Sequence, residues 1–215
     1  MAQLDALILT FQYWLAILAV VLMVSIVSAA GVYLFILWWR HHKREEHSLD
    51  YVLLQIAVPF NNEIKIDAAE QMMASLYSIK KGGRFKFLQL QPHISFEIVA
   101  GHEDIRFYVS VPRKLRDLVE KQINGAYSDA DINEVPEYNI FSENGRIAFA
   151  ELEFKQTAYR PIKVYKDLPT DPLSLMTTAL ARMEDEEGAA IQIMVSPAES
   201  KWQSLGRSYV SGIKK

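Results

Sequence analysis

The chain opens with a long apolar stretch that ends in positive charge. Residues 6–39 contain no Asp, Glu, Lys or Arg, and the basic cluster RHHKR at 40–44 follows at once. A hydrocarbon core about 30 Å thick is crossed by roughly 20 apolar residues in a helix. Residues 14–39, the densest part, exceed that length. The pattern therefore predicts a helix that spans a membrane.

A cleaved signal peptide and a buried core helix are the alternatives to a retained anchor. A signal peptide carries a basic segment before its apolar core, but no Lys or Arg precedes Arg40. The apolar run also continues past the small residues 28–30 that resemble a cleavage site. A core helix usually runs 8–20 residues and would need a large domain around it. We therefore expect a retained anchor in the lipid bilayer.

The positive charges predict the orientation of this anchor. Every Lys and Arg lies at or after Arg40, whereas the N-terminal flank carries Asp5. Loops rich in Lys and Arg stay in the cytoplasm, so we expect a single-pass protein of the inner membrane with its N-terminus outside and its C-terminal domain inside. Trp14 at one end, with Trp38 and Trp39 at the other, fits the aromatic belts of two membrane interfaces.

After a polar tether, the spacing of apolar residues switches between that of strands and that of helices. Alternation at every second residue is typical of a strand, and repeats every three or four residues are typical of a helix. Asp67, followed three positions later by Glu70, is a capping-box pattern that predicts a helix start. The elements predicted in order are a strand at 51–60, a helix at 67–79, a hairpin of 94–98 and 105–111, a helix at 112–123 and a strand at 130–135.

This order is that of the ferredoxin-like βαββαβ arrangement, in which two helices pack on one face of a four-stranded antiparallel sheet. Within the hairpin, Ile94, Phe96 and Ile98 alternate with Ser95 and Glu97. We expect the first set on a core and the second toward water. The predicted fold class is α+β.

The second half predicts a further lobe in the order strand, strand, helix, strand, helix. Asp171 as the N-cap, followed by Pro172 at the first helical position, predicts the start of the first helix. We expect this helix to run to Gly188. A capping box from Ser196 to Glu199 starts the last helix. The predicted strands of this lobe are a hairpin of 138–141 and 147–154, a strand at 161–165 and a strand at 191–195.

These elements divide the chain into three parts. They are the anchor with its tether, residues 1–47; the ferredoxin-like lobe, residues 48–138; and the second α+β lobe, residues 139–215. The second order of elements is a rough permutation of the first, without a repeat at the level of residues. Twin lobes and one larger layered domain are both compatible with the sequence.

Charge and composition narrow the classes of function. The net charge is −3, and because Asp5 is the one charged residue before Arg40, the rest of the chain holds all 23 Lys and Arg and all but one of the 26 acidic residues. A nucleic-acid-binding domain usually shows a basic excess, so direct binding of nucleic acid is not favoured. The absence of cysteine excludes thiol catalysis, disulfides and thiolate metal sites.

No motif for catalysis or cofactor binding is found. A phosphate-binding loop needs Gly-x-x-x-x-Gly-Lys-Ser/Thr, which the basic turn Lys80-Lys81-Gly82-Gly83-Arg84 lacks. A solvated turn is the better interpretation of that segment, with an anion site as the alternative. No serine lies in a Gly-x-Ser-x-Gly elbow. We therefore expect no enzyme activity, no cofactor and no catalytic, cofactor-binding or metal-binding residue.

The histidines do not form a set of metal ligands by their spacing. His41, His42 and His47 lie in the tether, and their spacing fits no known zinc or iron pattern. His93 precedes a predicted strand and His102 lies in a predicted turn. Each of these two is more typical of a surface residue than of a ligand.

Three further features have a structural and a functional interpretation. Met72 and Met73 could line an adaptable binding groove, but a stripe at helical spacing is more often core. The acidic run 184–187 could attract a divalent ion, but successive helical carboxylates point in different directions, so a solvated helix end is favoured. Trp202 and Tyr209 on the last helix are the candidates for partner contact.

Eight segments after the tether have a familiar combination of sequences: 52–60, 63–64, 68–78, 92–98, 107–111, 118–123, 134–138 and 171–193. Together they resemble an uncharacterised bacterial domain found at the N-terminus of membrane-anchored ATPases of the HerA/TraG type, the motors associated with type IV secretion and conjugation. The resemblance covers nearly all residues after the tether, and its motifs are structural rather than catalytic.

The resemblance implies an anchored α+β region that precedes a RecA-like motor. No motor and no Walker motif lie before Lys215, so we expect either the N-terminal piece of a longer product or a subunit that works beside a separate motor. The expected function is a non-enzymatic, membrane-tethered adaptor that docks a motor ATPase in the same or an adjacent polypeptide, or forms a homo-oligomer. The alternative is a single-pass membrane sensor whose ferredoxin-like lobe binds a small ligand.

Overall fold

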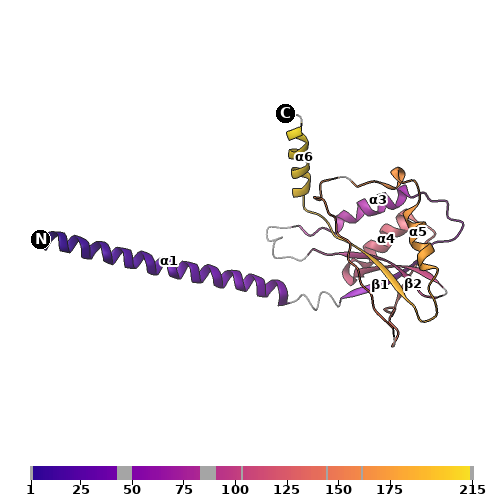
Figure 1. The fold of residues 1–215 in the computed structure, drawn as a ribbon, viewed down its shortest axis with the longest axis horizontal. Coiled ribbons are helices and arrows are strands. Elements are labelled where there is room, and N and C mark those ends of the chain that lie inside the picture. The colour runs from indigo at the N-terminus through magenta and orange to yellow at the C-terminus, as the bar shows by residue number, and fades with distance from the viewer. Residues whose placement is uncertain are drawn as a thin grey trace. The chain divides into compact units, whose positions relative to one another are not determined.

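The structure is a computed structural model that describes residues 2–42, 50–82, 91–102, 104–143, 145–160 and 162–213. The chain forms two compact units (Figure 1). The first contains the N-terminal helix, and the second, which we call the α/β unit, contains residues 50–82 and the chain from 91 onward. We describe each unit by itself.

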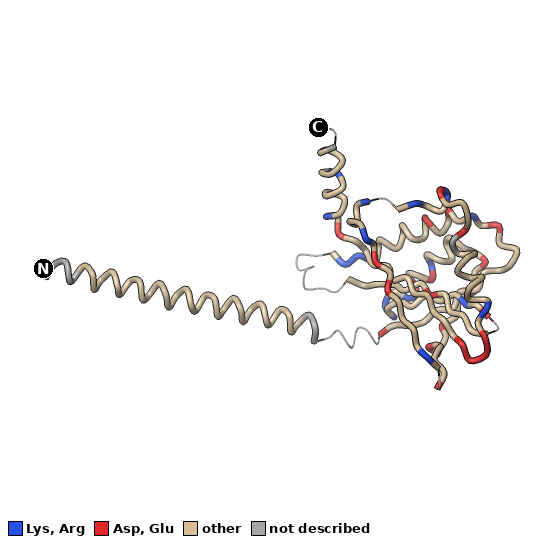
Figure 2. The backbone as a smooth tube through the Cα atoms, viewed as in Figure 1, with Lys and Arg blue, Asp and Glu red and all other residues tan. Residues whose placement is uncertain are grey.

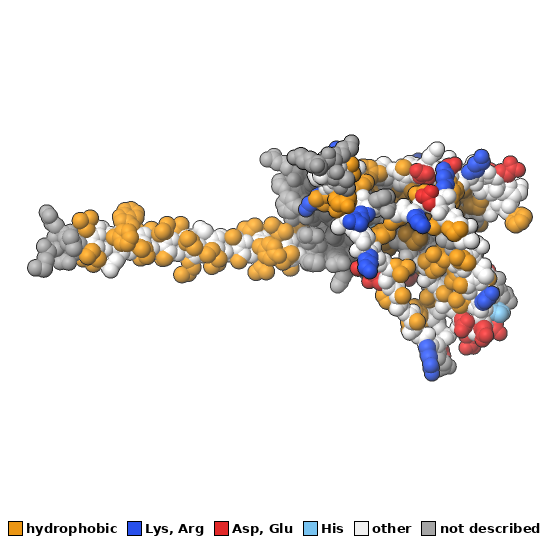
Figure 3. Space-filling model, turned by 45° about the horizontal axis from the view of Figure 1, so that its top comes forward, with side chains coloured by type: hydrophobic (Ala, Val, Ile, Leu, Met, Phe, Trp, Pro, Cys, Tyr) orange, Lys and Arg blue, Asp and Glu red, His pale blue; other side chains and the backbone are white. Residues whose placement is uncertain are grey.

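The N-terminal helix α1 is continuous from Ala2 to His42. Its segment Leu7–Trp39 is long and apolar enough to cross a membrane, and none of that segment is buried. Figure 2 shows no charged residue along α1 between its grey ends, and Figure 3 shows apolar side chains along its described length. At about 1.5 Å per residue, its 33 residues extend roughly 50 Å. The predicted apolar helix is confirmed, with the length that membrane spanning requires.

The α/β unit is built on one five-stranded sheet with the order β4-β1-β3-β2-β5. Every pair of neighbouring strands is antiparallel. The strands are β1 (Tyr51–Ala57), β2 (Ile94–Ala100), β3 (Ile105–Pro112), β4 (Asp131–Val135) and β5 (Ala189–Val195). Strands β1 to β4 have the chain order and antiparallel pairing of a ferredoxin-like lobe, so the predicted α+β class is confirmed.

The helices of the α/β unit place the main core on one face of this sheet. They are α3 (Asp67–Ser75), α4 (Arg116–Ala126), α5 (Pro172–Leu180) and α6 (Lys201–Ile213), with 3₁₀ turns at Leu76–Ile79, Arg113–Leu115 and Tyr165–Asp167. Figure 1 shows α3, α4 and α5 on the same side of the sheet. The fully buried side chains between this face and the helices include Leu54, Ile94, Val109, Val111 and Val119.

The starts of two predicted helices differ from their capping patterns. Asp67 is the first residue of α3 rather than its cap, and no side chain caps the helix at the preceding residue. The Asp67 carboxylate instead accepts a hydrogen bond of 2.8 Å from the Tyr165 hydroxyl and lies 3.3 Å from the Lys166 ammonium. The last helix begins at Lys201, two residues beyond the predicted Ser196–Glu199 box. In both places the capping sequence occurs, and at Asp67 its carboxylate is engaged by Tyr165 and Lys166 instead.

The helix after Asp171 begins as predicted and ends earlier. The Asp171 carboxylate accepts a hydrogen bond of 3.0 Å from the Leu173 amide, with Pro172 at the first helical position. The helix stops at Leu180, before the acidic run 184–187. Four successive carboxylates would oppose the negative end of a helix dipole. They lie instead in a turn in which Glu186 has a positive φ of 65°.

The predicted hairpin of 138–141 and 147–154 is wrong within the described residues, because neither segment is assigned to a strand. Residues 162–164 of the strand predicted at 161–165 are likewise not a strand, and a 3₁₀ turn begins at Tyr165. The strand predicted at 191–195 does form, as β5, and it pairs with β2 of the ferredoxin-like lobe. The last strand of the second half is thus part of the same sheet as the first half.

Candidate functional site

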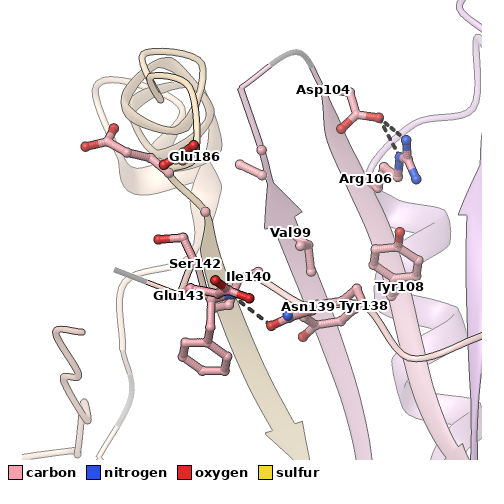
Figure 4. A pocket seen from close by; sticks show the side chains of 15 residues that line it. Val99, Asp104, Arg106, Tyr108, Tyr138, Asn139, Ile140, Ser142, Glu143 and Glu186 are labelled. Atoms are coloured by element: carbon pink, nitrogen blue, oxygen red, sulfur yellow. Dashed lines mark hydrogen bonds and ion pairs between the residues drawn. The ribbon is translucent and has the colours of Figure 1, made fainter. Parts of the chain in front are cut away.

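The sheet face opposite α3 and α4 is covered by residues 136–142, which have no regular secondary structure and which we call the cover segment. Because side chains alternate along a strand, β1, β2 and β3 each present their second set of residues here. A separate core cluster lies under the cover segment, formed by Leu53, Val99 and Tyr108 with Val135, Tyr138, Ile140 and Ala190 packed against it. Figure 4 shows Tyr138, Asn139 and Ile140 lying across this face beside Val99 and Tyr108.

Glu97 is the polar residue at the centre of this face. Its residue surface is only 6% exposed, and its carboxylate accepts a hydrogen bond of 2.7 Å from the Tyr138 hydroxyl. The Gln192 amide donates to the same hydroxyl at 3.3 Å, and the Tyr138 ring stacks on Tyr108 with ring centroids 5.3 Å apart. The expectation that Glu97 faces water is therefore wrong, since the cover segment buries it.

The electrostatics of Tyr138 follow from this contact. Burial of the ring, and then the hydrogen bond to Glu97, raise the pKa of the Tyr138 hydroxyl to about 12. The hydroxyl is thus protonated at neutral pH and acts as the donor to the carboxylate. A buried carboxylate with a dedicated donor is stable, whereas one without a partner is costly. The pair therefore holds the cover segment on the sheet.

Two cavities flank Tyr138. One, of about 480 Å³, is lined by Glu97, Ser110, Arg113, Glu137 and Gln192 among others. The second, of about 640 Å³, includes the Asp104 and Arg106 ion pair and the cover segment (Figure 4). In the first cavity the Arg113 guanidinium lies 3.5 Å from Glu134, which leaves Glu97 and Glu137 without a cationic partner among the described residues that line it. The first cavity can therefore accept a cation or a hydrogen-bond donor.

Polar contacts continue along the same face toward the start of β2. The Tyr51 hydroxyl lies 3.0 Å from Nδ1 of His93, and burial raises the pKa of Tyr51 above its ordinary value. Ser95, the residue before Phe96 on the strand, is buried, and its hydroxyl oxygen has no hydrogen-bond partner among the described atoms. This row of polar groups is the candidate site, and its one contact between a hydroxyl and an imidazole among the described residues is that of Tyr51 with His93.

We expect Tyr138→Phe to lower the free energy of unfolding by about 1–3 kcal/mol, because it leaves the buried Glu97 carboxylate without its donor. Urea denaturation of the α/β unit, residues 50–213, measures this. Tyr209→Phe, which removes a hydroxyl from an exposed ring, is the matched control and should change the value by less than about 0.5 kcal/mol. Equal effects of the two substitutions would contradict the role given to Tyr138.

The raised pKa of Tyr138 also predicts a pH dependence. A group with a higher pKa in the folded state stabilises the fold below its unfolded pKa and loses that contribution as the pH rises through its folded pKa. The contribution of Tyr138 is therefore present below pH 10 and is lost between about pH 10 and 12. Subtracting the stability curve of Tyr138→Phe from that of the parent isolates this step, and a flat difference over that range would contradict it.

The residues singled out in the sequence are dispersed. His93 contacts Tyr51, whereas His102 lies 3.1 Å from the Met183 carbonyl and 3.2 Å from the Asp185 carboxylate. No group of three metal-binding side chains is found among the described residues. The tether histidines and the 83–84 end of the basic turn lie outside the described side chains. Of these residues, the structure places His93 and His102 in separate contacts.

The remaining sequence candidates divide between core and surface. Met72 is buried in the core, whereas Met73 is exposed. The Lys80 ammonium donates to the Tyr77 hydroxyl and to the Ala198 carbonyl, both at 2.9 Å. Trp202 and Tyr209 are both exposed, and the Tyr209 ring packs against Tyr159 with centroids 5.4 Å apart.

Several of the most exposed apolar side chains of the α/β unit lie at the end of the cover segment and directly after it. Phe149 is 88% exposed and Leu152 is 96% exposed. Figure 3 shows apolar side chains gathered on one face of this unit. We use the name apolar strip for the exposed apolar side chains of residues 141–154, which are Phe141, Ile147, Phe149, Leu152 and Phe154. Large exposed apolar side chains concentrated in one segment are typical of an interaction site.

Sequence reasoning found neither the Glu97–Tyr138 pair nor the exposure of the apolar strip. The two members of the pair are separated by 41 positions, and no local period links them. The sequence of the apolar strip does carry a signal, namely strand-like alternation, but that pattern predicts an internal hairpin rather than an exposed surface.

Comparison with known proteins gives one family. Neither a search of curated proteins nor a search of solved structures finds a match to this chain. The sequence model of a domain of unknown function, DUF8128, matches residues 44–213, which include the whole described α/β unit. This chain therefore belongs to the DUF8128 family of domains of unknown function.

Proposed function

We propose that this protein is a non-enzymatic, membrane-anchored assembly module that docks a cytoplasmic motor ATPase or associates with itself. The observation that carries the proposal is the apolar strip, in which Phe149 and Leu152 are almost fully exposed. Large side chains in water at this density are unfavourable unless a partner covers them. The partner chemistry is therefore an apolar protein surface.

The anchor supports the same proposal. Leu7–Trp39 is suited to the bilayer, and the basic residues after it favour a cytoplasmic α/β unit by the positive-inside rule. The module would then work at the inner membrane with its N-terminus outside. The resemblance to the N-terminal domain of HerA/TraG-type ATPases suggests a motor of type IV secretion or DNA transfer as the partner. This last step rests on resemblance alone.

A pull-down tests the docking. We expect the double variant Phe149→Ser/Phe154→Ser in the full chain to bind a HerA/TraG-type motor encoded beside it at least tenfold more weakly, because central apolar contacts dominate interface affinity. Phe60→Ser is the matched control, since Phe60 is also fully exposed but lies outside the apolar strip. Equal binding by all three proteins would contradict docking through the strip. ATP hydrolysis by residues 48–215 that a point substitution abolishes would contradict the non-enzymatic assignment.

The second candidate function is a single-pass sensor that binds a small ligand. The cavity of about 480 Å³ beside the buried Glu97 favours it, because a carboxylate in a sheltered pocket is a specific acceptor for an amine. The expected signature is a rise of several degrees in melting temperature with one compound from a screen of small amines. The rise should be absent in Glu97→Gln, and a rise of the same size in that variant would exclude this pocket.

A further inference from the structure

The two edges of the sheet differ in their protection. Edge strands expose unpaired backbone groups, and native proteins protect them with charged side chains or proline. At one edge, β4 carries Asp131, Asn133 and Glu134. At the other edge, β5 has the sequence AAIQIMV, without charge or proline, and its Met194 is 73% exposed. The β5 edge is therefore open to a further strand.

The same chain contains a segment that could supply this further strand. Residues 146–156 neither donate nor accept a backbone or side-chain hydrogen bond within the described part of the chain. They include the strand-like alternation of 147–154 and most of the apolar strip. When an extended segment joins a sheet edge, its backbone groups gain hydrogen-bond partners and its exposed phenyl rings are removed from water.

We propose that residues 147–154 of one copy add as an antiparallel strand to the β5 edge of a second copy. This inference rests on the proposed assembly function and names its partner as a second copy of this chain. Phe149 lies opposite Ile193 in the proposed register, and Ile147 lies opposite Val195. The new pair would be antiparallel, as are all four strand pairs already present in this sheet.

The register is chosen by side-chain complementarity. With Phe149 opposite Ile193, Ala150 lies opposite Gln192 and Leu152 opposite Ala190. Apolar residues then lie opposite apolar residues at positions 147, 148, 149 and 152, whereas Ala150, Glu151 and Glu153 lie opposite Gln192, Ile191 and Ala189. Beyond the end of the proposed strand, Lys155 comes beside Glu187, and their opposite charges attract.

A strand from the same chain cannot take this place. Residues 145–148 and 185–188 line one cavity of about 510 Å³, so Ile147 lies near the start of its own β5. The proposed pairing needs Ile147 opposite Val195, at the other end of that strand, which is about 20 Å further on at 3.3 Å per residue. Pairing within one chain would have to be parallel.

Each copy then offers one strand and accepts one strand at a different place. Such a contact is heterologous, and it generates rings when the rotation between copies closes and open chains when it does not. The inference therefore predicts either a closed ring, of which a reciprocal dimer is the smallest, or an open chain of copies.

Disulfide trapping tests the contact, because the chain contains no cysteine. A full-length Ala150→Cys chain is mixed with a full-length Gln192→Cys chain in lipid vesicles and oxidised. Directly opposed antiparallel positions lie about 4.5–5.5 Å apart between Cα atoms, within the 4.4–6.8 Å that a disulfide allows. We expect a covalent dimer from the mixture and none from either chain alone. The double variant should give a doubly linked dimer if two copies close a ring, and a ladder of larger products otherwise. Ala150→Cys with Asn133→Cys, on the β4 edge, is the matched control and should give no dimer.

Three results would overturn the inference. Absence of dimer from the mixture, with Ala148→Cys and Leu152→Cys also negative against Gln192→Cys, excludes strand addition at β5. A stronger product at position 148 or 152 contradicts the register. An internal disulfide in Glu151→Cys/Gln192→Cys without larger products indicates parallel pairing within one chain. The motor pull-down on the same preparations separates the two proposals, because retained motor binding without cross-linking leaves the assembly function standing.

Discussion

We expect a chain that lacks residues 1–42 to leave the membrane fraction completely. The deletion removes α1, which contains the one segment of the described chain suited to spanning a bilayer. No interfacial or electrostatic attachment of the remaining residues approaches the affinity of a spanning helix. Fractionation with alkaline washing measures the result: the full chain stays in the pellet and the shortened chain moves to the supernatant.

Deletion of residues 201–213 is the control for this experiment. It removes α6, the helix that carries the exposed side chains of Trp202 and Tyr209. The protein without α6 should stay in the pellet. A shortened chain that still sediments with membranes after the alkaline wash would contradict anchoring by α1. If the whole chain is expressed but the recovered protein begins near residue 30, the signal-peptide alternative would be supported instead.

The second large effect is on stability. We expect Leu54→Ala to lower the free energy of unfolding of residues 50–213 by about 2–5 kcal/mol, because it removes a side chain from the packed core and leaves a cavity. Leu54 has no exposed surface and lies in the central strand pair of β1 with β3. Since domains of this size are stable by roughly 5–15 kcal/mol, a substantial part of the stability is lost.

Leu175→Ala in α5 is the matched control, with the same atoms removed from a side chain that is exposed. Urea denaturation should show a change of less than about 0.5 kcal/mol for it. Similar losses in the two variants would mean that burial in the sheet core does not determine the stability of this unit.

Much of the ferredoxin-like part could be predicted from sequence because its signals are local. The alternation in residues 51–57 and 94–111 indicates strands, and the stripe in 115–123 indicates a helix, independently of the rest of the chain. The order of these elements then leaves few compact arrangements. The membership of β5 in the same sheet was not predicted, because alternation within a strand does not specify its neighbour.

The errors have a common physical origin in contacts between distant parts of the chain. Alternation places Glu97 on the second face of β2, but it does not reveal that Tyr138 will cover that face. Asp67 carries a capping signal, yet Tyr165 and Lys166 engage its carboxylate. The strand pattern in 147–154 is present without an internal partner, and the proposed strand addition would make that local prediction correct between copies.

The candidate site was less accessible to sequence reasoning than the fold. Neither Glu97 nor Tyr138 belongs to a motif, and the pair is defined only by burial and a hydrogen bond of 2.7 Å. His93 and His102, the two histidines whose side chains the structure describes, lie in separate contacts, with Tyr51 and with Met183. The exposed Trp202 and Tyr209 were found because the last helix has one apolar side, which is a local property.

The anchor has a consequence for affinity. Once inserted in a bilayer, a helix such as α1 would restrict copies to two dimensions. The local concentration of one α/β unit around another would then rise without any change in the contact itself, as it does for linked binding modules. A strand exchange with a dissociation constant in the millimolar range would leave residues 50–213 monomeric at micromolar concentration in solution. Among full chains that share one membrane, the same contact would be formed by most copies. The membrane would then act as the switch between single copies and assembly.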